Sequence, residues 1–320
     1  MIRQQTLCLI SASLLVVASI WTGIEGFPFQ GNKPSQDAAD ERSPYFHARS
    51  VIDYTRRELI EWIPKLRKVE FAQTQEGLPA LLDGVGETVE EFYRDFPSIY
   101  ALENIYLETE GPGRQEWLEY LRLSYHYVIS ENSMNNELGF DEYRTRTNLK
   151  NERVTIANLK QAYLLTSGCA SQVLFFHPRM RAACSFRFIG TEPAGHKAAV
   201  IAFAQIPEKT KTTGSIIIRQ RRVAIMLQGV VWIEPETRQI LRMQSDLLVR
   251  RSDVGLGQLT TQIDFEGVAF PGLSGTRWLP REVRVTLQCD GHSYRNFHRY
   301  SQYKLFSVES QDGPRKLARP

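Results

Sequence analysis

The chain has 320 residues, enough for one large β domain or two smaller domains that bury a core without metal ions or disulfide staples. Lys and Arg outnumber Asp and Glu by 39 to 36, and a formal net charge of +3 gives no support for a nucleic-acid partner. With 42% hydrophobic and 23% charged residues, the composition is ordinary for a globular protein.

Residues 1–26 have the pattern of an export signal. Arg3 supplies the positive start, and the apolar run 7–21 is shorter than the roughly 20 residues that span a bilayer comfortably. The junction at 22–26 is a poor cleavage site, so a retained single anchor stays open beside the cleaved signal peptide that we favour. Either alternative places the protein in the periplasm, the cell envelope or outside the cell, with membrane contact only through an uncleaved N-terminal segment.

Three cysteines follow the signal, at Cys169, Cys184 and Cys289. In an oxidising compartment Cys169 and Cys184 could form a disulfide, and the odd count leaves at least one thiol unbridged. The alternative is that all three are small buried apolar residues, which the low number of cysteines slightly favours.

The next segments are predicted to be a flexible polar leader over 27–46 and a helical segment over 47–97. Apolar residues recur at three- and four-residue intervals from residue 47, and Pro64 should end or kink this first helix. A second helix should begin near Pro79, weakened by Gly84 and Gly86, and stop before Pro97.

From residue 98 to 310 the period changes to two, which predicts antiparallel strands. Residues 152–166 are ambiguous between strand and helix. A short helix is expected near 169–177, because its apolar residues do not alternate and His177-Pro178 should terminate it. Residues 311–320 should be a loose basic tail. Further strands are expected at 101–109, 117–129, 140–149, 184–190, 196–206 and 259–270.

Two hairpins stand out in the last third of the chain. The first spans 228–249, with its loop at 234–238 and apolar residues at alternate positions in both arms. The second turns at Asp290-Gly291, a pair that readily adopts the two positive-φ positions of a type I′ turn. For the earlier hairpin arm at 196–206, two inward-facing sets stay open: Ala198 and Val200, or Ala199, Ile201 and Phe203.

The predicted fold is α+β: a large curved antiparallel sheet, shaped as a half-barrel, with helices packed on its concave face. The segments GVVWIEPET (229–237), WLP (278–280) and YSQYKLF (300–306) resemble half-barrel proteins related to the periplasmic lipoprotein carriers of the LolA type. The segments LPALL (78–82), FYRDFP (92–97) and LTSG (165–168) are similar to exported acidobacterial proteins of uncharacterised function.

The resemblance covers roughly residues 78–309 and implies an apolar-ligand site on the concave face, without catalytic residues to carry over. The chain departs from the carriers in being longer, and its leader and first helix match nothing in them. What the resemblance implies is therefore an architecture and a class of ligand.

Pairing across Asp290-Gly291 should place one apolar strand beside a hydrogen-bonding strand on a single face of the sheet. Such a mixed face suits the lining of a ligand pocket. The alternative, which we favour, is a core edge at which Tyr and His tips reach water. The candidate lining residues are Val283, Val285 and Leu287 on one strand and Tyr294, Asn296, His298 and Tyr300 on the other.

Catalytic and metal sites find little support in the sequence. His292 and His298 share a strand face but lie about 20 Å apart, too far for one ion. The glycine-rich stretch 190–197 lacks the order of a phosphate loop, and 272–275 lacks the form of a nucleophile elbow. Asp264 is more simply explained as part of the solvated side of a strand. We therefore expect no metal and no cofactor.

Three functional hypotheses follow. The favoured one is a non-enzymatic envelope protein that binds a lipid-like or other apolar ligand, or an envelope protein partner, in the half-barrel. The second is a structural or scaffolding envelope domain with a filled core. The third is an exported hydrolase whose catalytic residues converge only in space.

Overall fold

A computed structural model describes residues 11–13, 43–110, 118–132, 138–147, 170–193, 197–210, 214–218 and 221–306 of the chain. Eleven strands form one antiparallel sheet in the order β2-β6-β7-β10-β11-β12-β13-β14-β3-β4-β5. Its strands are β2 (Glu70–Phe71), β3 (Ile99–Glu110), β4 (Leu118–Asn132), β5 (Gly139–Arg146), β6 (Cys184–Glu192), β7 (Ala198–Gln205), β10 (Leu227–Ile233), β11 (Ile240–Leu247), β12 (Leu256–Ala269), β13 (Thr276–Cys289) and β14 (His292–Leu305).

A second, three-stranded sheet has the order β1-β8-β9. Its strands are β1 (Ser11–Ser13), β8 (Gly214–Ile218) and β9 (Arg221–Ile225). The helices are η1 (Ser43–Tyr45), η2 (Val51–Asp53), α2 (Arg56–Trp62), η3 (Pro64–Lys68), α3 (Leu78–Arg94), η6 (Ala170–Phe176), α4 (Pro178–Arg181) and η7 (Ser252–Val254), where η denotes a 3-10 helix.

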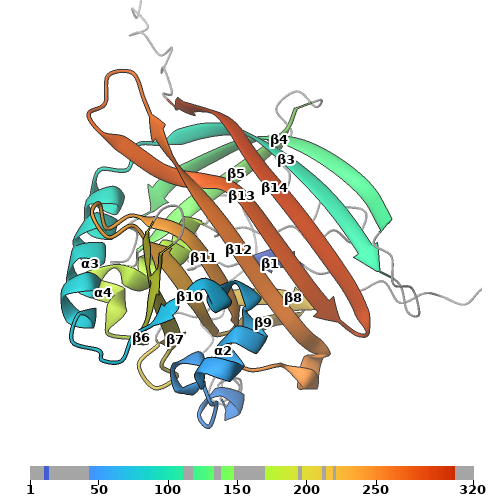
Figure 1. The fold of residues 1–320 in the computed structure, drawn as a ribbon. Coiled ribbons are helices and arrows are strands. Elements are labelled where there is room, and N and C mark those ends of the chain that lie inside the picture. Colours follow the sequence, from blue (N-terminus) through green and yellow to red (C-terminus); the bar gives the residue numbers. More distant parts are fainter. Residues whose placement is uncertain are drawn as a thin grey trace, which may run out of the picture.

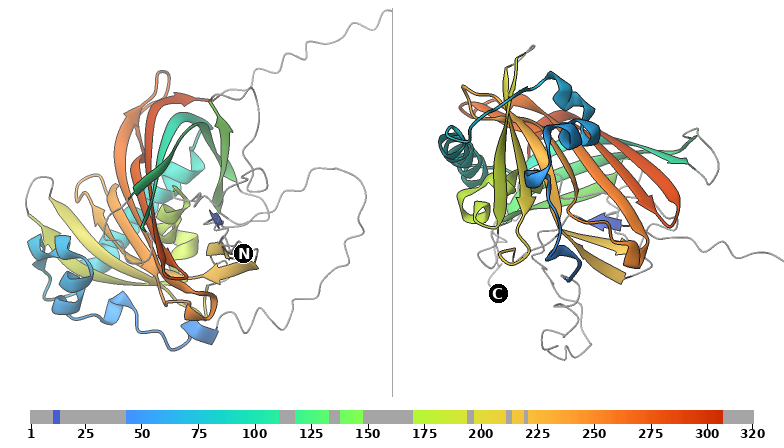
Figure 2. Two further views of the ribbon diagram at one scale, coloured as in Figure 1. Left: turned by 90° about the vertical axis from the view of Figure 1, so that its right-hand side faces the viewer. Right: turned by 60° about the horizontal axis from the view of Figure 1, so that its bottom comes forward.

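The large sheet is open and bends into a trough, which Figures 1 and 2 show from three directions. This confirms the predicted fold class. Both hairpins are also confirmed: β10 pairs with β11, and β13 pairs with β14 across a turn in which Asp290 and Gly291 have φ angles of 51° and 77°. The predicted strand at 140–149 is β5, although residues 148–149 and the ambiguous segment 152–166 lie outside the described residues.

The helices divide between the two faces of the sheet. Helices α3, η6 and α4, which we call the roof, lie on the concave side of the sheet as expected, with α3 at one end of the trough. The predicted first helix, observed as α2 and η3 with a break at Pro64, lies on the opposite, convex face against β7 and β10. The expectation of helices on the concave face therefore holds for the roof alone.

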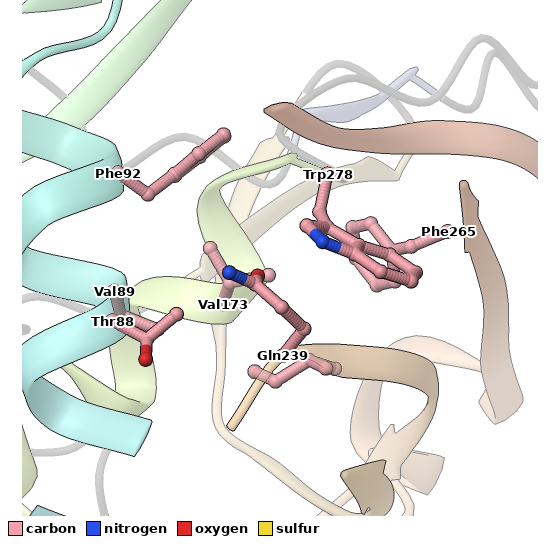
Figure 3. A pocket seen from close by; sticks show the side chains of 8 residues that line it. Thr88, Val89, Phe92, Val173, Gln239, Phe265 and Trp278 are labelled. Carbon is pink, nitrogen blue, oxygen red and sulfur yellow. The ribbon is translucent and has the colours of Figure 1, made fainter. Parts of the chain in front are cut away.

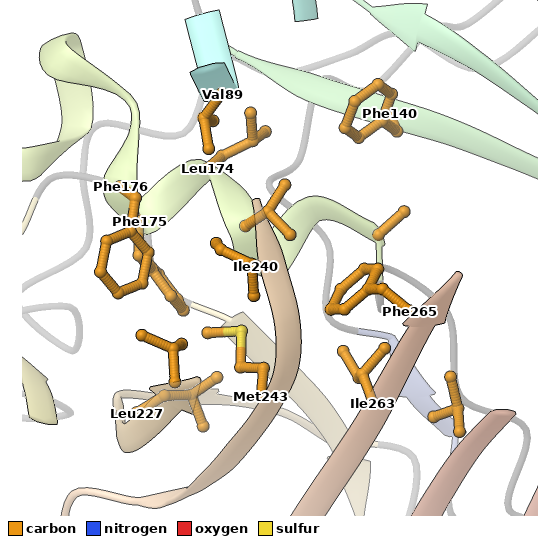
Figure 4. Close-up of a cluster of buried hydrophobic side chains, with 14 of the residues drawn as sticks. Val89, Phe140, Leu174, Phe175, Phe176, Leu227, Ile240, Met243, Ile263 and Phe265 are labelled. Carbon is orange, nitrogen blue, oxygen red and sulfur yellow. The ribbon is translucent and has the colours of Figure 1, made fainter. Parts of the chain in front are cut away.

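Two hydrophobic clusters follow from this arrangement. The larger one joins the roof to the concave face, and Figure 4 shows Leu174 and Phe176 of η6 above Met243 and Ile263 of the strands. It also includes Ile216 and further residues of the β8–β9 hairpin. The smaller cluster joins α2 and η3 to the convex face. Every residue of β7 and β10 is buried, because both of their faces are covered.

The sequence leaves open two alternative sets of inward-facing residues in β7. In the structure both sets are buried, one on each face of the sheet. Ala199, Ile201 and Phe203 belong to the larger cluster, whereas Ala198 and Val200 belong to the smaller one. Strict alternation of hydrophobic and polar residues is absent here because neither face of β7 meets water.

Local sequence signals explain where several elements begin and end. Helix α2 starts with a capping box. The hydroxyl of Thr55 accepts a hydrogen bond from the backbone N–H of Glu58, and the carboxylate of Glu58 accepts one from the backbone N–H of Thr55. Pro79 occupies the first turn of α3, where its missing N–H costs nothing. Strands β9 and β10 are separated by one residue in the sequence but belong to different sheets.

Gly229 of β10 permits a close approach of neighbouring backbone and side chain. A Cβ at this position would lie 2.2 Å from the carbonyl oxygen of Gln244 and 2.6 Å from the ring of Phe203. We expect Gly229→Ala to lower the free energy of unfolding by about 2–3 kcal/mol, because both neighbours are fixed by packing. Chemical denaturation measures this loss. Gly77→Ala, with nothing within 4 Å of the added Cβ, should change it by less than about 1 kcal/mol, and equal losses would contradict the assignment.

Candidate ligand site in the trough

A pocket lies at the seam between the roof and the sheet (Figure 3). We call it the seam pocket; α3 contributes one wall, η6 a second, and the strands and the β10–β11 turn the rest. Its volume is about 20 Å³, room for about one water molecule, so the seam pocket itself is nearly closed. The lining residues are Thr88, Val89, Phe92, Val173, Gln239, Ile240, Phe265 and Trp278.

The roof is held together by a close helix contact and one exposed ion pair. A Cβ on Gly86 of α3 would come 3.3 Å from the carbonyl oxygen of Phe176, so glycine lets α3 approach η6 closely. Arg181 of α4 reaches Asp83 of α3 at 2.9 Å, but both side chains are partly exposed and such pairs contribute little. Two glycines within α3 lower its intrinsic stability by about 1 kcal/mol each. Packing against the rest of the roof and the sheet therefore supplies most of the stability of α3.

The C-terminal end of α3 is fastened to β5. The hydroxyl of Tyr93 accepts a hydrogen bond of 3.2 Å from the backbone N–H of Gly139. The ring of Phe140 lies 5.4 Å from that of Tyr93 and 4.8 Å from that of Phe96, between ring centroids. These aromatic contacts make this the firmer end of α3.

A buried ion cluster lies on the concave face of β14, β3 and β5. Glu103 accepts bonds of 2.5 and 2.9 Å from the guanidinium of Arg144 and lies 2.9 Å from Nδ1 of His298. Because an ionised carboxylate can only accept, Nδ1 of His298 is the donor in this contact. Arg144 also lies over the ring of Tyr127 and 3.8 Å from Glu142. All three members of the ion cluster are buried.

The charge state of Glu103 follows from its partners. Burial by itself would raise the pKa of this carboxyl, but the Arg144 charge and the hydrogen bonds from His298 and Arg144 outweigh it and lower the pKa to about 2. Glu103 is therefore ionised across the physiological range. No spacing in the sequence predicts this cluster, because its members come from three strands far apart in the chain.

The predicted lining residues share one face, as expected. Register pairs Val283 with His298, Val285 with Asn296 and Leu287 with Tyr294, which confirms the predicted alignment of the hairpin. Tyr294 is half-buried and the other six are buried. They lie on the concave face without lining the seam pocket, and their role in ligand binding stays a prediction.

Two of the three cysteines that follow the signal, Cys184 and Cys289, lie within the described residues and are buried. Cys184 is a free buried thiol, and burial raises its pKa to about 12, while Cys169 lies outside the described residues. The disulfide therefore stays a prediction. His292 pairs with Cys289 in register, but across the described ranges no three His, Cys, Asp or Glu side chains gather as metal ligands. In the same ranges, no helix has the length and apolar character needed to cross a bilayer.

A second buried carboxyl lies on the convex face beneath α2. Asp246 of β11 accepts hydrogen bonds from the hydroxyl of Thr260 and, at 3.3 Å, from the amide of Gln244. Burial raises the pKa of Asp246 to about 6, although hydrogen bonds from Thr260, Gln244 and Trp62 oppose this. The pKa values of Glu103 and Asp246 are therefore shifted in opposite directions.

Glu103→Gln should lower the free energy of unfolding by about 3–5 kcal/mol at neutral pH, because it removes the carboxylate that accepts both hydrogen bonds from the buried Arg144 and leaves only the more distant Glu142 near that charge. The wild-type contribution of Glu103 should be present above about pH 4.5 and be lost as the pH falls toward 2. Denaturant titrations at several pH values measure both effects.

The matched control is Glu108→Gln on the same strand. Glu108 pairs with Arg295 at 2.7 Å on the partly exposed convex face, so its loss should cost no more than about 1 kcal/mol. Comparable losses in the two variants would show that the ion cluster is not the buried network described above.

Asp246 should lower stability as the pH rises from about 4 to about 6, because the folded protein holds this proton more tightly than the unfolded chain. We expect Asp246→Asn to be more stable than wild type above pH 6, by on the order of 2 kcal/mol. The difference should disappear near pH 4. Thermal melts at matched ionic strength test this, and a constant difference at every pH would refute it.

No protein-family model matches the sequence, and no curated protein matches it. Among solved structures, a DUF1329 family protein from Desulfovibrio piger is 12% identical, with a TM-score of 0.39 over 72% of this chain and 94% of that one. A putative outer membrane lipoprotein-sorting protein domain from Vibrio parahaemolyticus is 12% identical, with a TM-score of 0.35 and the same coverage. The second of these proteins is described as lipoprotein-sorting, the class of protein that the sequence resembles. Neither likeness carries an argument about function, and the acidobacterial resemblance stays a prediction.

Proposed function

We propose that this protein is a non-enzymatic component of the cell envelope that binds an apolar, lipid-like ligand between the roof and the concave face of the sheet. The observation that carries the proposal is the position of the seam pocket, bounded by α3, η6 and the strands. Phe92, Phe265 and Trp278 provide aromatic surface there, which is typical of sites for apolar ligands.

Binding requires the roof to move, because the seam pocket holds only about one water molecule in the closed state. Helix α3 is suited to this movement. It has two internal glycines and an exposed ion pair near its N-terminal end, whereas aromatic contacts hold its C-terminal end against β5. Elements of low local stability are those that open in folded proteins. We infer that the N-terminal part of α3 lifts while its C-terminal end stays in place.

The second candidate is a structural envelope domain with a filled core. The small volume of the seam pocket favours this alternative, because a permanently packed trough would look the same. An exported hydrolase has less support. His298 and Glu103 form a histidine–carboxylate contact, but both side chains have 0% exposure, and a substrate in solution would not reach them.

An apolar fluorescent probe separates the first two candidates. We expect the protein to bind the probe with saturation, and purified protein to carry lipid that is detectable by mass spectrometry. Thr88→Trp, which fills the seam pocket from α3, should weaken probe binding at least about tenfold by removing the space the ligand enters. Fluorescence titration measures this.

Glu87→Trp is the matched control, because it adds the same ring to the exposed face of the same helix turn. It should leave the affinity for the probe within about twofold. Thermal melts establish that both variants are folded. Failure of the folded wild-type protein to bind any apolar probe would favour the filled-core alternative.

A further inference from the structure

The concave face carries a row of small residues between two apolar rows. Gly229, Ser245 and Thr261 are neighbours in register across β10, β11 and β12. The row on one side is Val231, Met243 and Ile263, and the row on the other side includes Leu227, Leu247 and Leu259. The small-residue row therefore places the hydroxyl groups of Ser245 and Thr261 between two rows of apolar side chains.

Gln172 of η6 contacts this row from the roof. Its Oε1 accepts a hydrogen bond of 2.8 Å from the hydroxyl of Ser245, and the side chain is 2% exposed. Its Nε2 is buried and has no hydrogen-bond partner among the described residues. A buried donor without an acceptor costs about 1–3 kcal/mol, so a group that accepts from it would be bound favourably.

The position of Gln172 connects this donor with the proposed ligand site. It precedes Val173, which lines the seam pocket, on the same short helix. Ser245 lies on β11, two residues beyond Met243 of the larger hydrophobic cluster. A ligand that separates η6 from the strands would therefore meet the Nε2 donor as well as apolar side chains.

The chemistry around Gln172 favours a neutral acceptor. A carboxylate or phosphate would need a nearby cation to offset its desolvation, and the buried guanidinium of Arg144 is already bound by Glu103 on distant strands. A carbonyl oxygen accepts from an amide N–H and carries no net charge.

We propose that Gln172, supported by Ser245, is a specificity-determining residue that binds a neutral carbonyl group on an otherwise apolar ligand. This inference rests on the proposed function, since it names the polar part of the ligand that the roof would cover. It predicts discrimination between molecules of equal length that differ in a single carbonyl.

The test compares a long-chain methyl ketone with the alkane of the same carbon number, each displacing the apolar fluorescent probe from the full-length protein. We expect the ketone to bind about tenfold more tightly than the alkane. Gln172→Met, which keeps the length and loses the donor, should bind the ketone no more tightly than the alkane, because the buried carbonyl then has no donor. A fatty acid, ionised at neutral pH, should bind more weakly than the ketone.

Infrared spectroscopy supplies a readout that does not require the variant to fold. The carbonyl stretch of the bound ketone should lie at lower frequency in wild type than in alkane solvent, as for a hydrogen-bonded carbonyl. Equal binding of ketone and alkane by wild type, or a stretch unshifted from alkane solvent, would overturn the role of Gln172 and leave apolar binding intact. Absence of binding by ketone, alkane and probe alike would overturn the proposed function as well.

Discussion

The structure depends on how η6 covers the concave face of the sheet. All seven residues of η6 are buried, and its aromatic side chains pack on Phe203 and Phe186 of the neighbouring strands. A curved sheet of this width exposes a hydrocarbon surface that must be covered by protein or by ligand. The roof covers part of that surface, and α3 reaches the trough largely through η6 and α4. The stability of the closed state and the access of a ligand are therefore controlled by the same contact.

Polar groups within the trough follow two patterns. In the ion cluster Glu103 accepts hydrogen bonds from both Arg144 and His298, so these donors are already used in connecting β14, β3 and β5. The amide of Gln172 is only half satisfied within the described residues, and it lies where the roof meets the strands. The ion cluster and Gln172 are both buried, so burial does not distinguish them. Their hydrogen bonding does: the ion cluster has the character of a structural network, and Gln172 that of a group that can bind a ligand.

Much of the fold could be predicted from hydrophobic periodicity. The first hairpin was predictable because apolar residues alternate in both of its arms, and the second because Asp290 and Gly291 suit the positive φ angles of its turn. The register of β13 and β14 then fixed which side chains share a face. The faces of β7 were not predictable, because helices cover both sides and the alternation disappears. The position of α2 on the convex face could not be predicted either, because the sequence of an amphipathic helix does not determine which of two apolar surfaces it covers.

The candidate site was predictable only in outline. Aromatic residues such as Phe92 and Trp278 are common in cores, and only the meeting of α3, η6 and the strands makes them a pocket. Glu103, Arg144 and His298 are separated by long stretches of sequence, so no spacing rule joins them. Gln172 lies in an apolar run whose pattern predicts a buried helix. Its role as a hydrogen-bonding group could not be predicted, because its partner Ser245 is 73 residues away in the sequence.

The central claim is that α3 opens while the sheet stays folded. Native-state hydrogen exchange tests this most directly, by comparing amides of the first turns of α3 with those of β10, β11 and β12. The account predicts that the α3 amides exchange through an opening of much lower free energy than global unfolding, and that a bound apolar ligand changes their exchange more than that of the strands. Exchange of α3 and the central strands with one common free energy, equal to that of global unfolding, would contradict it.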